Sequence, residues 1–356
     1  MIIKSSELRS VDSSEAHTPS PATQKQSEEK VVEAEKELRL GPAVAGAQSA
    51  AAPGEKPDAI ATRRALTRQL RKRVKKFVAL APQVRADGNP KIVHDMRVWS
   101  RRVQQAVSAL FPKPRSGKVR RLRRVPRRMR RALGDWRNCD VLLEIVARQQ
   151  RRTRSEDKRR AWGFVRDYLL QRRAKEVARA GKRLLRQEVA DYAALADKLL
   201  RQPADEKPEV LMQRLRDSVQ GAWSNWQAAL TRAQETRAVS DLHAFRIATK
   251  DLRYRTELLY DVGYTQMKPQ LKWLAELQDA IGVWHDRQVL YQSVAKAVAR
   301  AEVLLNQLST VRILLAELEK DRKHESIEAE KIFRLALEHQ RHLPLTPNPS
   351  PVSRKE

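Results

Sequence analysis

The stretch VHDMRVWSRRVQQAVSAL, residues 93–110, carries the pattern that decides the fold. Its apolar residues recur at the spacing of one helical face, which predicts a helix with one buried side. They are Val93, Met96, Val103, Val107 and Leu110. His94, Arg97 and Arg101 follow one another at spacings of three and four residues, so they form a cationic stripe beside the buried side.

The same pattern recurs in the stretch LHAFRIATKDLRY, residues 242–254. Its cationic stripe consists of His243, Arg246, Lys250 and Arg253. A second pair of stretches, LGDWRNCDVL at 133–142 and IGVWHDRQVL at 281–290, follows in the same order and at nearly the same separation. Two motifs that recur in order indicate a duplicated helical unit.

The composition favours a chain built from helices. Only 11 of the 356 residues are glycine and 5% are aromatic, whereas Leu, Ala, Arg and Glu are abundant. No segment alternates apolar and polar residues with the period of a strand. We therefore predict an all-α fold, with enough apolar residues, 41% of the chain, to fill a core.

Shifts in composition divide the chain into five segments. Residues 1–60 are rich in Ser, Glu, Gln, Ala and Pro and are predicted to be disordered, as is the proline-containing tail 343–356. The stretch RQPADEKP, residues 201–208, is predicted to be a linker. A first helical half is then expected at 61–200 and a second at 209–342.

Glycines in the second repeated motif suggest helix boundaries. Gly134 and Gly282 are expected to end helices in the left-handed conformation. Asn138 and Asp286 follow four residues later and are expected to cap the next helices. The pattern thus predicts two separate helices in the second half, at 266–281 and 286–308.

The charge of the chain points to a polyanionic partner. The net charge is +29, from 72 Lys and Arg against 43 Asp and Glu. Residues 61–140 alone hold 25 basic residues against 4 acidic ones, so internal ion pairs cannot neutralise them. A field of this strength suits nucleic acid, polyphosphate or an anionic membrane surface.

The cationic stripes are the candidate anion-binding residues. Cations at three- and four-residue spacing repel one another by a few tenths of a kcal/mol per pair, so an external anion is the natural compensation. The planar fork of arginine suits phosphate oxygens, and histidine also donates hydrogen bonds. Further anion contacts are expected from Arg64, Arg68, Arg71, Lys75, Arg120, Arg124, Arg137, Lys268 and Lys272.

Motifs for other chemistry are weak. The single Cys139 excludes an internal disulfide and a cysteine-based metal cluster. Neither stripe histidine has a partner ligand at metal-binding spacing, and Asp135 and Asp140 suit a helix corner better than a divalent ion. No phosphate-binding loop or nucleophile elbow is present, and no window suits a membrane span. We therefore expect a cytoplasmic protein without metal, cofactor or catalytic residues.

The two repeated motifs together resemble the CHAD domain, the conserved histidine α-helical domain. The resemblance covers roughly 61–340 and rests on the His-x-x-Arg-(Val/Ile)-x-x-(Arg/Lys) helices and on the corner motifs. It implies two four-helix bundles related by a pseudo-twofold axis around a central basic cavity. It also implies a non-catalytic protein that binds inorganic polyphosphate, at polyphosphate granules, through the seven stripe residues His94, Arg97, Arg101, His243, Arg246, Lys250 and Arg253.

The chain departs from the family pattern at two positions. Asn138 stands where the corner usually has aspartate, which keeps the capping ability and removes a charge. Pro126 falls inside a helix at about 117–133 that is usually continuous, and it is expected to kink or shorten that helix. A fused phosphate hydrolase is not expected, because EAEKE at 33–37 ends in Glu37 where its signature needs lysine.

Three alternatives stay open at this point. The first is an architectural nucleic-acid binder held by non-specific charge, although no DNA-binding motif is recognised. The second is an enzyme that acts on phosphate esters or polyphosphate, or an accessory of one. The third is a scaffold at a granule surface that uses residues 1–60, which is compatible with polyphosphate binding. The oligomeric state and the length of the ligand do not follow from the sequence.

Overall fold

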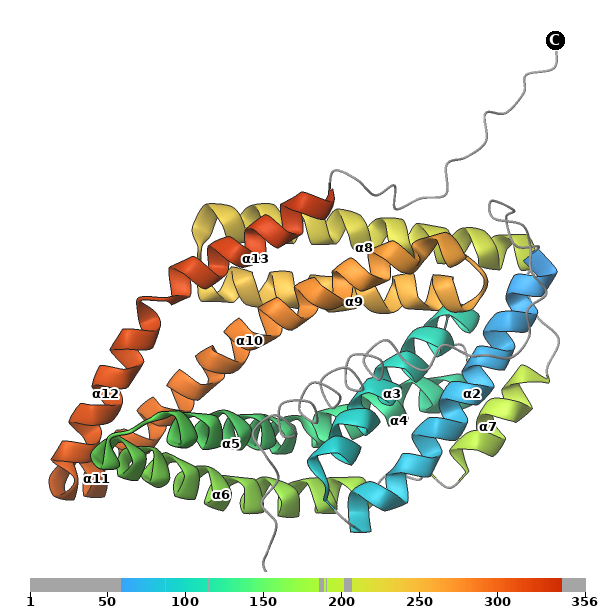
Figure 1. Cartoon of the computed structure of the whole chain (residues 1–356). Helices are drawn as coiled ribbons and strands as arrows, with labels where there is room; N and C mark the ends of the chain where they lie inside the picture. Colours follow the sequence, from blue (N-terminus) through green and yellow to red (C-terminus); the bar gives the residue numbers. More distant parts are fainter. Residues whose placement is uncertain are drawn as a thin grey trace, which may run out of the picture. The chain divides into compact units, whose positions relative to one another are not determined.

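The computed structural model describes residues 59–86, 88–113, 116–185, 189, 191–201 and 207–340. Every regular element among these residues is a helix, so the predicted all-α fold class is confirmed (Figure 1). Of the segment 1–60 that was predicted to be disordered, residues 1–58 fall outside the described residues, and Ala59 and Ile60 belong to the first helix. The predicted tail 343–356 and the centre of the predicted linker also fall outside the described residues. The helices are α2 (Ala59–Ala86), α3 (Pro90–Leu110), α4 (Gly117–Ala132), α5 (Gly134–Arg152), α6 (Glu156–Leu185), α7 (Tyr192–Leu200), α8 (Pro208–Thr236), α9 (Val239–Asp261), the 3-10 turn η1 (Thr265–Met267), α10 (Lys268–Val298), α11 (Ala301–Asn306), α12 (Leu308–Arg322) and α13 (Glu325–Gln340).

The opening stretch forms α3 as predicted. Asn89 caps the helix by accepting a hydrogen bond from the backbone nitrogen of Lys91 at 2.9 Å, and Pro90 occupies the first turn, where its missing N–H leaves no intrahelical bond unmade. Gly88 precedes this cap with a φ of 60°, a conformation that glycine adopts without steric strain. The apolar positions Val93, Met96, Val103 and Val107 are buried, so the predicted face packs into the core.

One predicted helix boundary is wrong, and another lies where it was predicted but is formed differently, since α4 ends at Ala132 beside Gly134. Gly134 does not end a helix in the left-handed conformation; it begins α5, and Leu133 joins α4 to α5 at a φ of −89°. Gly282 lies inside α10, which continues without a break where two helices were expected. The neighbours Ile281 and Trp284 are buried, and their packing holds this glycine in a helical conformation despite its low propensity.

The residues expected to cap helices therefore have other positions. Asn138 lies exposed within α5, and Asp286 lies half-buried within α10. Pro126 was expected to kink or shorten its helix. α4 continues through it to Ala132, so the helix is not shortened, and the kink stays a prediction. Proline in a helix interior costs about 3 kcal/mol. Burial of Pro126 with its neighbours Val125 and Met129 offsets that cost.

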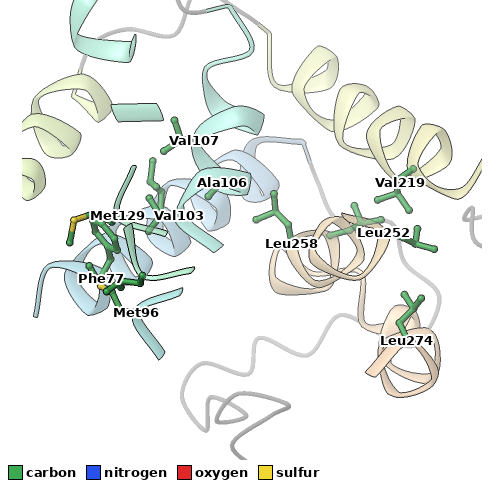
Figure 2. Packing of buried hydrophobic residues seen from close by; sticks show 14 of the residues in the cluster. Phe77, Met96, Val103, Ala106, Val107, Met129, Val219, Leu252, Leu258 and Leu274 are labelled. Atoms are coloured by element: carbon green, nitrogen blue, oxygen red, sulfur yellow. The ribbon is translucent and has the colours of Figure 1, made fainter. Parts of the chain in front are cut away.

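Two hydrophobic clusters form the core. The first combines buried side chains of α2, α3, α4 and α7 with those of α8, α9, α10 and α13, and Figure 2 shows part of it. The second combines α5 and α6 with the C-terminal part of α10 and with α11 and α12. Each cluster draws on both predicted sequence halves, so helices from the two halves pack directly on each other. The division into two duplicated bundles stays a prediction.

A buried ionic cluster ties α2 to α3 and α9. Only 2% of the Arg73 side chain is exposed, and its guanidinium donates to the Asp261 carboxylate at 2.6 Å and to the backbone oxygen of Arg102 at 2.9 Å. Glu257 lies 3.7 Å from the same guanidinium and 2.6 Å from Arg102 Nε. Because α3 and α9 carry the two cationic stripes, this cluster helps to hold the stripes against each other.

Candidate anion-binding site

Arg97 and Arg101 of the first stripe are half-buried where α3 meets α4 and α9. Arg97 donates a hydrogen bond from Nη1 to the backbone oxygen of Arg130 in α4 at 2.8 Å. The guanidinium carbon of Arg101 lies 5.9 Å from the ring centre of Tyr254 in α9. Burial, together with the charges of Arg101, Arg130 and Arg137, lowers the pKa of Arg97 to about 10, so Arg97 stays charged at neutral pH.

The second stripe meets the first across the contact between α3 and α9. Burial lowers the pKa of Lys250 to about 6, and the charges of Arg246, Arg101 and Arg97 contribute to the shift. Two of these three arginines belong to α3, whereas Lys250 and Arg246 belong to α9. The cationic residues of the two repeated motifs therefore lie within electrostatic reach of one another.

Arg130 joins this group, although no repeated motif contains it. Its Nη1 donates to Gln104 Oε1 of α3 at 2.6 Å. Burial lowers its pKa to about 10, and the neighbouring charge of Arg101 lowers it as well. The sequence marks Arg130 only as one of many arginines in α4, because its contact with α3 depends on how the two helices pack. We call Arg97, Arg101, Arg130, Arg246 and Lys250 the seam cluster.

The seam cluster has no carboxylate partner within ion-pair distance among the residues that the structure describes. Two other arginines of the fold with little exposed surface do have one: Arg173 lies 2.6 Å from Asp140, and Arg102 lies 2.6 Å from Glu257. The buried Nε of Arg246 has no hydrogen-bond partner in the described part of the chain. Partly desolvated cations with unused donors make a site prepared for an external anion.

One carboxylate, Asp286 of α10, acts on the seam cluster from a greater distance. Its charge favours the protonated forms of Arg246 and Lys250. Burial raises the pKa of Asp286 itself, while Arg246 and Lys250 oppose that shift. Among the described residues, the seam combines four arginines and Lys250 with the charge of Asp286, which leaves an excess of positive charge.

Three histidines have distinct positions in the fold. His94 lies exposed on α3, and His243 lies exposed on α9. The ring of His243 is 5.2 Å from that of His285 in α10, measured between ring centres. Burial, followed by the charge of Arg246, lowers the pKa of His243, and the same two causes lower that of His285 to about 3. His243 and His285 therefore contribute neutral hydrogen-bonding groups beside the seam.

The other candidates differ in their relation to the seam cluster. Arg137 acts electrostatically on Arg97 and lies 3.6 Å from Glu144. Arg253 lies half-buried on α9. Exposed positions on α2, α4 and the start of α10 hold the remaining candidates Arg64, Arg68, Arg71, Lys75, Arg120, Arg124, Lys268 and Lys272. Of these, Arg71 pairs with Asp197 at 3.0 Å.

The acidic residues of the corner motif do not form a metal site in the described part of the chain. Asp140 is buried and accepts a hydrogen bond from Arg173 Nε at 2.6 Å. No group of three or more His, Cys, Asp and Glu side chains among the described residues could hold a metal ion. None of the described helices combines the length and the apolar composition that a membrane crossing requires.

Comparison with known proteins gives the family. A family model described as the CHAD domain matches residues 24–295. The chain belongs to the CHAD domain family. The matched range begins inside the segment that the composition marks as disordered, and it ends within α10. A search of curated proteins found no match.

Two solved structures share the CHAD fold of this chain. One is the CHAD domain from the plant Ricinus communis, with 19% identity and a TM-score of 0.55 over 82% of this chain and 97% of that one. The other is PptA from Streptomyces chartreusis, with 16% identity and a TM-score of 0.57 over 78% of this chain and 99% of that one. At these identities the likeness extends to the fold alone.

Proposed function

We propose that this CHAD protein binds inorganic polyphosphate at the seam cluster and catalyses no reaction on it. The observation that carries the proposal is the packing of α3 on α9, which brings Arg97 and Arg101 within electrostatic reach of Arg246 and Lys250. Membership of the CHAD family supports the same ligand, and a cytoplasmic location at polyphosphate granules is part of the proposal.

The burial of the seam cluster favours a thin anion over a duplex. Arg97, Arg246 and Lys250 are half-buried between packed helices, so the rigid surface of a nucleic-acid duplex has little access to their donors. A flexible chain of phosphates is narrow enough to place its oxygens against them one after another. Partial exclusion of water strengthens each of these charge-assisted hydrogen bonds.

Competition between polyanions tests this function. Labelled long-chain polyphosphate is bound at physiological salt and displaced by unlabelled polyphosphate or by duplex DNA. We expect polyphosphate to compete far better, and the affinity to fall steeply with salt because binding releases counterions. Equal competition by both polymers would show that the protein recognises negative charge alone.

The pH dependence of binding is expected to depend on Lys250. Its side chain faces Arg246 on α9, Arg97 and Arg101 on α3, and Asp286 on α10, and its pKa of about 6 leaves it mostly neutral at pH 7. A bound phosphate raises this pKa, so binding takes up a proton. The affinity is therefore fully developed below pH 6 and declines by up to about tenfold per pH unit above it.

The variant Lys250→Arg separates this effect from other titrations. Arginine stays charged throughout this range, so the variant should bind with a flatter pH profile between pH 6 and 8. Affinities of both proteins for long-chain polyphosphate at three pH values give the comparison. Parallel profiles for the two proteins would assign the pH dependence to another group.

A further inference from the structure

The outer face of α4 carries a dense row of cations. The helix contains no acidic residue. Its buried face, which includes Val119, Leu122 and Met129, packs into the core and fixes the opposite face toward solvent. The exposed cations are Lys118, Arg120, Arg124, Arg127, Arg128 and Arg131.

These cations lack the local compensation that other helices have. On α6, Arg160 lies 2.6 Å from Asp157 and Arg179 lies 2.8 Å from Glu176, each three residues away. On α4 the neighbours at three- and four-residue spacing are themselves cations, and each such pair opposes the helix. None of the six exposed cations forms an ion pair with a carboxylate in the described part of the chain.

The row on α4 is continuous with the seam cluster. Arg130 belongs to that cluster and lies in the last turn of α4. The charges of Arg127 and Arg131 act on Arg130, so the exposed row begins where the seam ends. From Arg131 back to Arg120 the row extends for about 16 Å along the helix, at about 1.5 Å per residue.

We propose that the outer face of α4 is a second binding surface, which takes the part of a long polyphosphate chain that extends beyond the seam. This inference rests on the proposed function of the seam. A chain held by the seam cluster passes Arg130 and then meets Arg131, Arg127, Arg124 and Arg120 in turn. Because the first contact tethers the chain, the second occurs at a high effective concentration and adds affinity only for long chains.

The ligand of this surface follows from its continuity with the seam and from its charge. A row of cations on an exposed helix forms no pocket around a ligand. It therefore binds a polyanion through counterion release and not through a complementary shape. Tripolyphosphate is too short to occupy the seam and reach along α4 at once. The affinity for long chains should therefore depend on α4, and the affinity for tripolyphosphate should depend on it far less.

The test compares two variants that each lose four positive charges. The α4 variant carries Arg120→Gln, Arg124→Gln, Arg127→Gln and Arg131→Gln. The control variant carries Arg312→Gln, Lys320→Gln, Lys331→Gln and Arg334→Gln, at exposed positions on α12 and α13. Glutamine keeps helix propensity, and circular dichroism with thermal melting establishes that both variants are folded. The probes are tripolyphosphate, long-chain polyphosphate and duplex DNA.

We expect the α4 variant to lose roughly tenfold or more in affinity for long-chain polyphosphate at physiological salt, with a shallower salt dependence. Its affinity for tripolyphosphate should fall far less than its affinity for long chains, because only the general field at the seam is weakened, and the control variant should bind both chains nearly normally. Equal losses in the two variants, or no loss in the α4 variant, would overturn the inference and leave the seam in place.

Two further outcomes would also contradict the inference. If the α4 variant loses affinity for duplex DNA and keeps its affinity for long-chain polyphosphate, the surface serves nucleic acid and the inference is wrong. If the unaltered protein binds neither tripolyphosphate nor long-chain polyphosphate, the proposed function of the seam fails, and the inference fails with it.

Discussion

Reversing the charge of Arg97 and Arg246 together is expected to remove polyphosphate binding almost completely. The double variant Arg97→Glu, Arg246→Glu loses one guanidinium fork on each side of the seam and places carboxylates against the phosphates. A charge-assisted hydrogen bond contributes about 1.5–3 kcal/mol, so the loss of both forks alone predicts a decrease in affinity on the order of a thousandfold. Binding isotherms with long-chain polyphosphate measure the loss.

The matched control reverses two exposed arginines away from the seam, as Arg152→Glu, Arg154→Glu. It changes the net charge by the same amount and should lower the affinity only slightly. The seam variant should also remain folded, because its new carboxylates relieve the mutual repulsion of Arg101, Arg130 and Lys250. This gain offsets the repulsion that a carboxylate at position 246 meets from Asp286. Equal losses of affinity in the two variants would mean that the protein attracts polyphosphate through its overall charge.

Replacing Arg73 is expected to have the largest effect on stability. The substitution Arg73→Leu leaves Asp261 and Glu257 without the guanidinium that lies between them, and it leaves the backbone oxygen of Arg102 without a donor. Burial already raises the pKa of Asp261, and the charge of Arg73 opposes that shift. Removing one partner of a buried ion pair lowers the free energy of unfolding by about 3–5 kcal/mol.

Chemical denaturation of the variant and of Arg71→Leu provides the comparison. Arg71 lies on the same helix and pairs with Asp197 at 3.0 Å, but both side chains are about half exposed, and such surface pairs contribute about 0–1 kcal/mol. A small and equal change in the two variants would show that the buried cluster contributes little. If Arg73→Leu loses both stability and polyphosphate binding, the result would agree with the position of this cluster between α2, α3 and α9.

The seam cluster shows which binding residues the sequence pattern can predict and which it cannot. Arg97, Arg101, Arg246 and Lys250 were predicted as binding residues from their spacing and from their recurrence in two motifs. Arg130 was missed, because it is one of eight arginines in α4 and only the packing of α4 on α3 distinguishes it. His285 was missed for a similar reason, since its position beside His243 depends on the contact between α9 and α10.

The differences from the predicted helix boundaries have a common physical cause. Gly134 and Gly282 were interpreted from the local preference of glycine for helix ends, and Pro126 from its local conflict with a helix. In the fold, burial of neighbouring side chains outweighs these preferences, so α10 runs through Gly282 and α4 runs through Pro126. As a result Asp286 is a mid-helix group that acts on Arg246 rather than a cap.

The sequence by itself determined the all-α class, the membership of the stripes and the excess of positive charge. These properties follow from the periodicity of a helix and from composition, which need no knowledge of distant contacts. Only the tertiary structure decided that the stripe of α3 meets the stripe of α9, and that the basic row of α4 begins at their meeting point. These contacts between helices depend on which buried faces pack together. That packing depends on the shapes of side chains far apart in the chain.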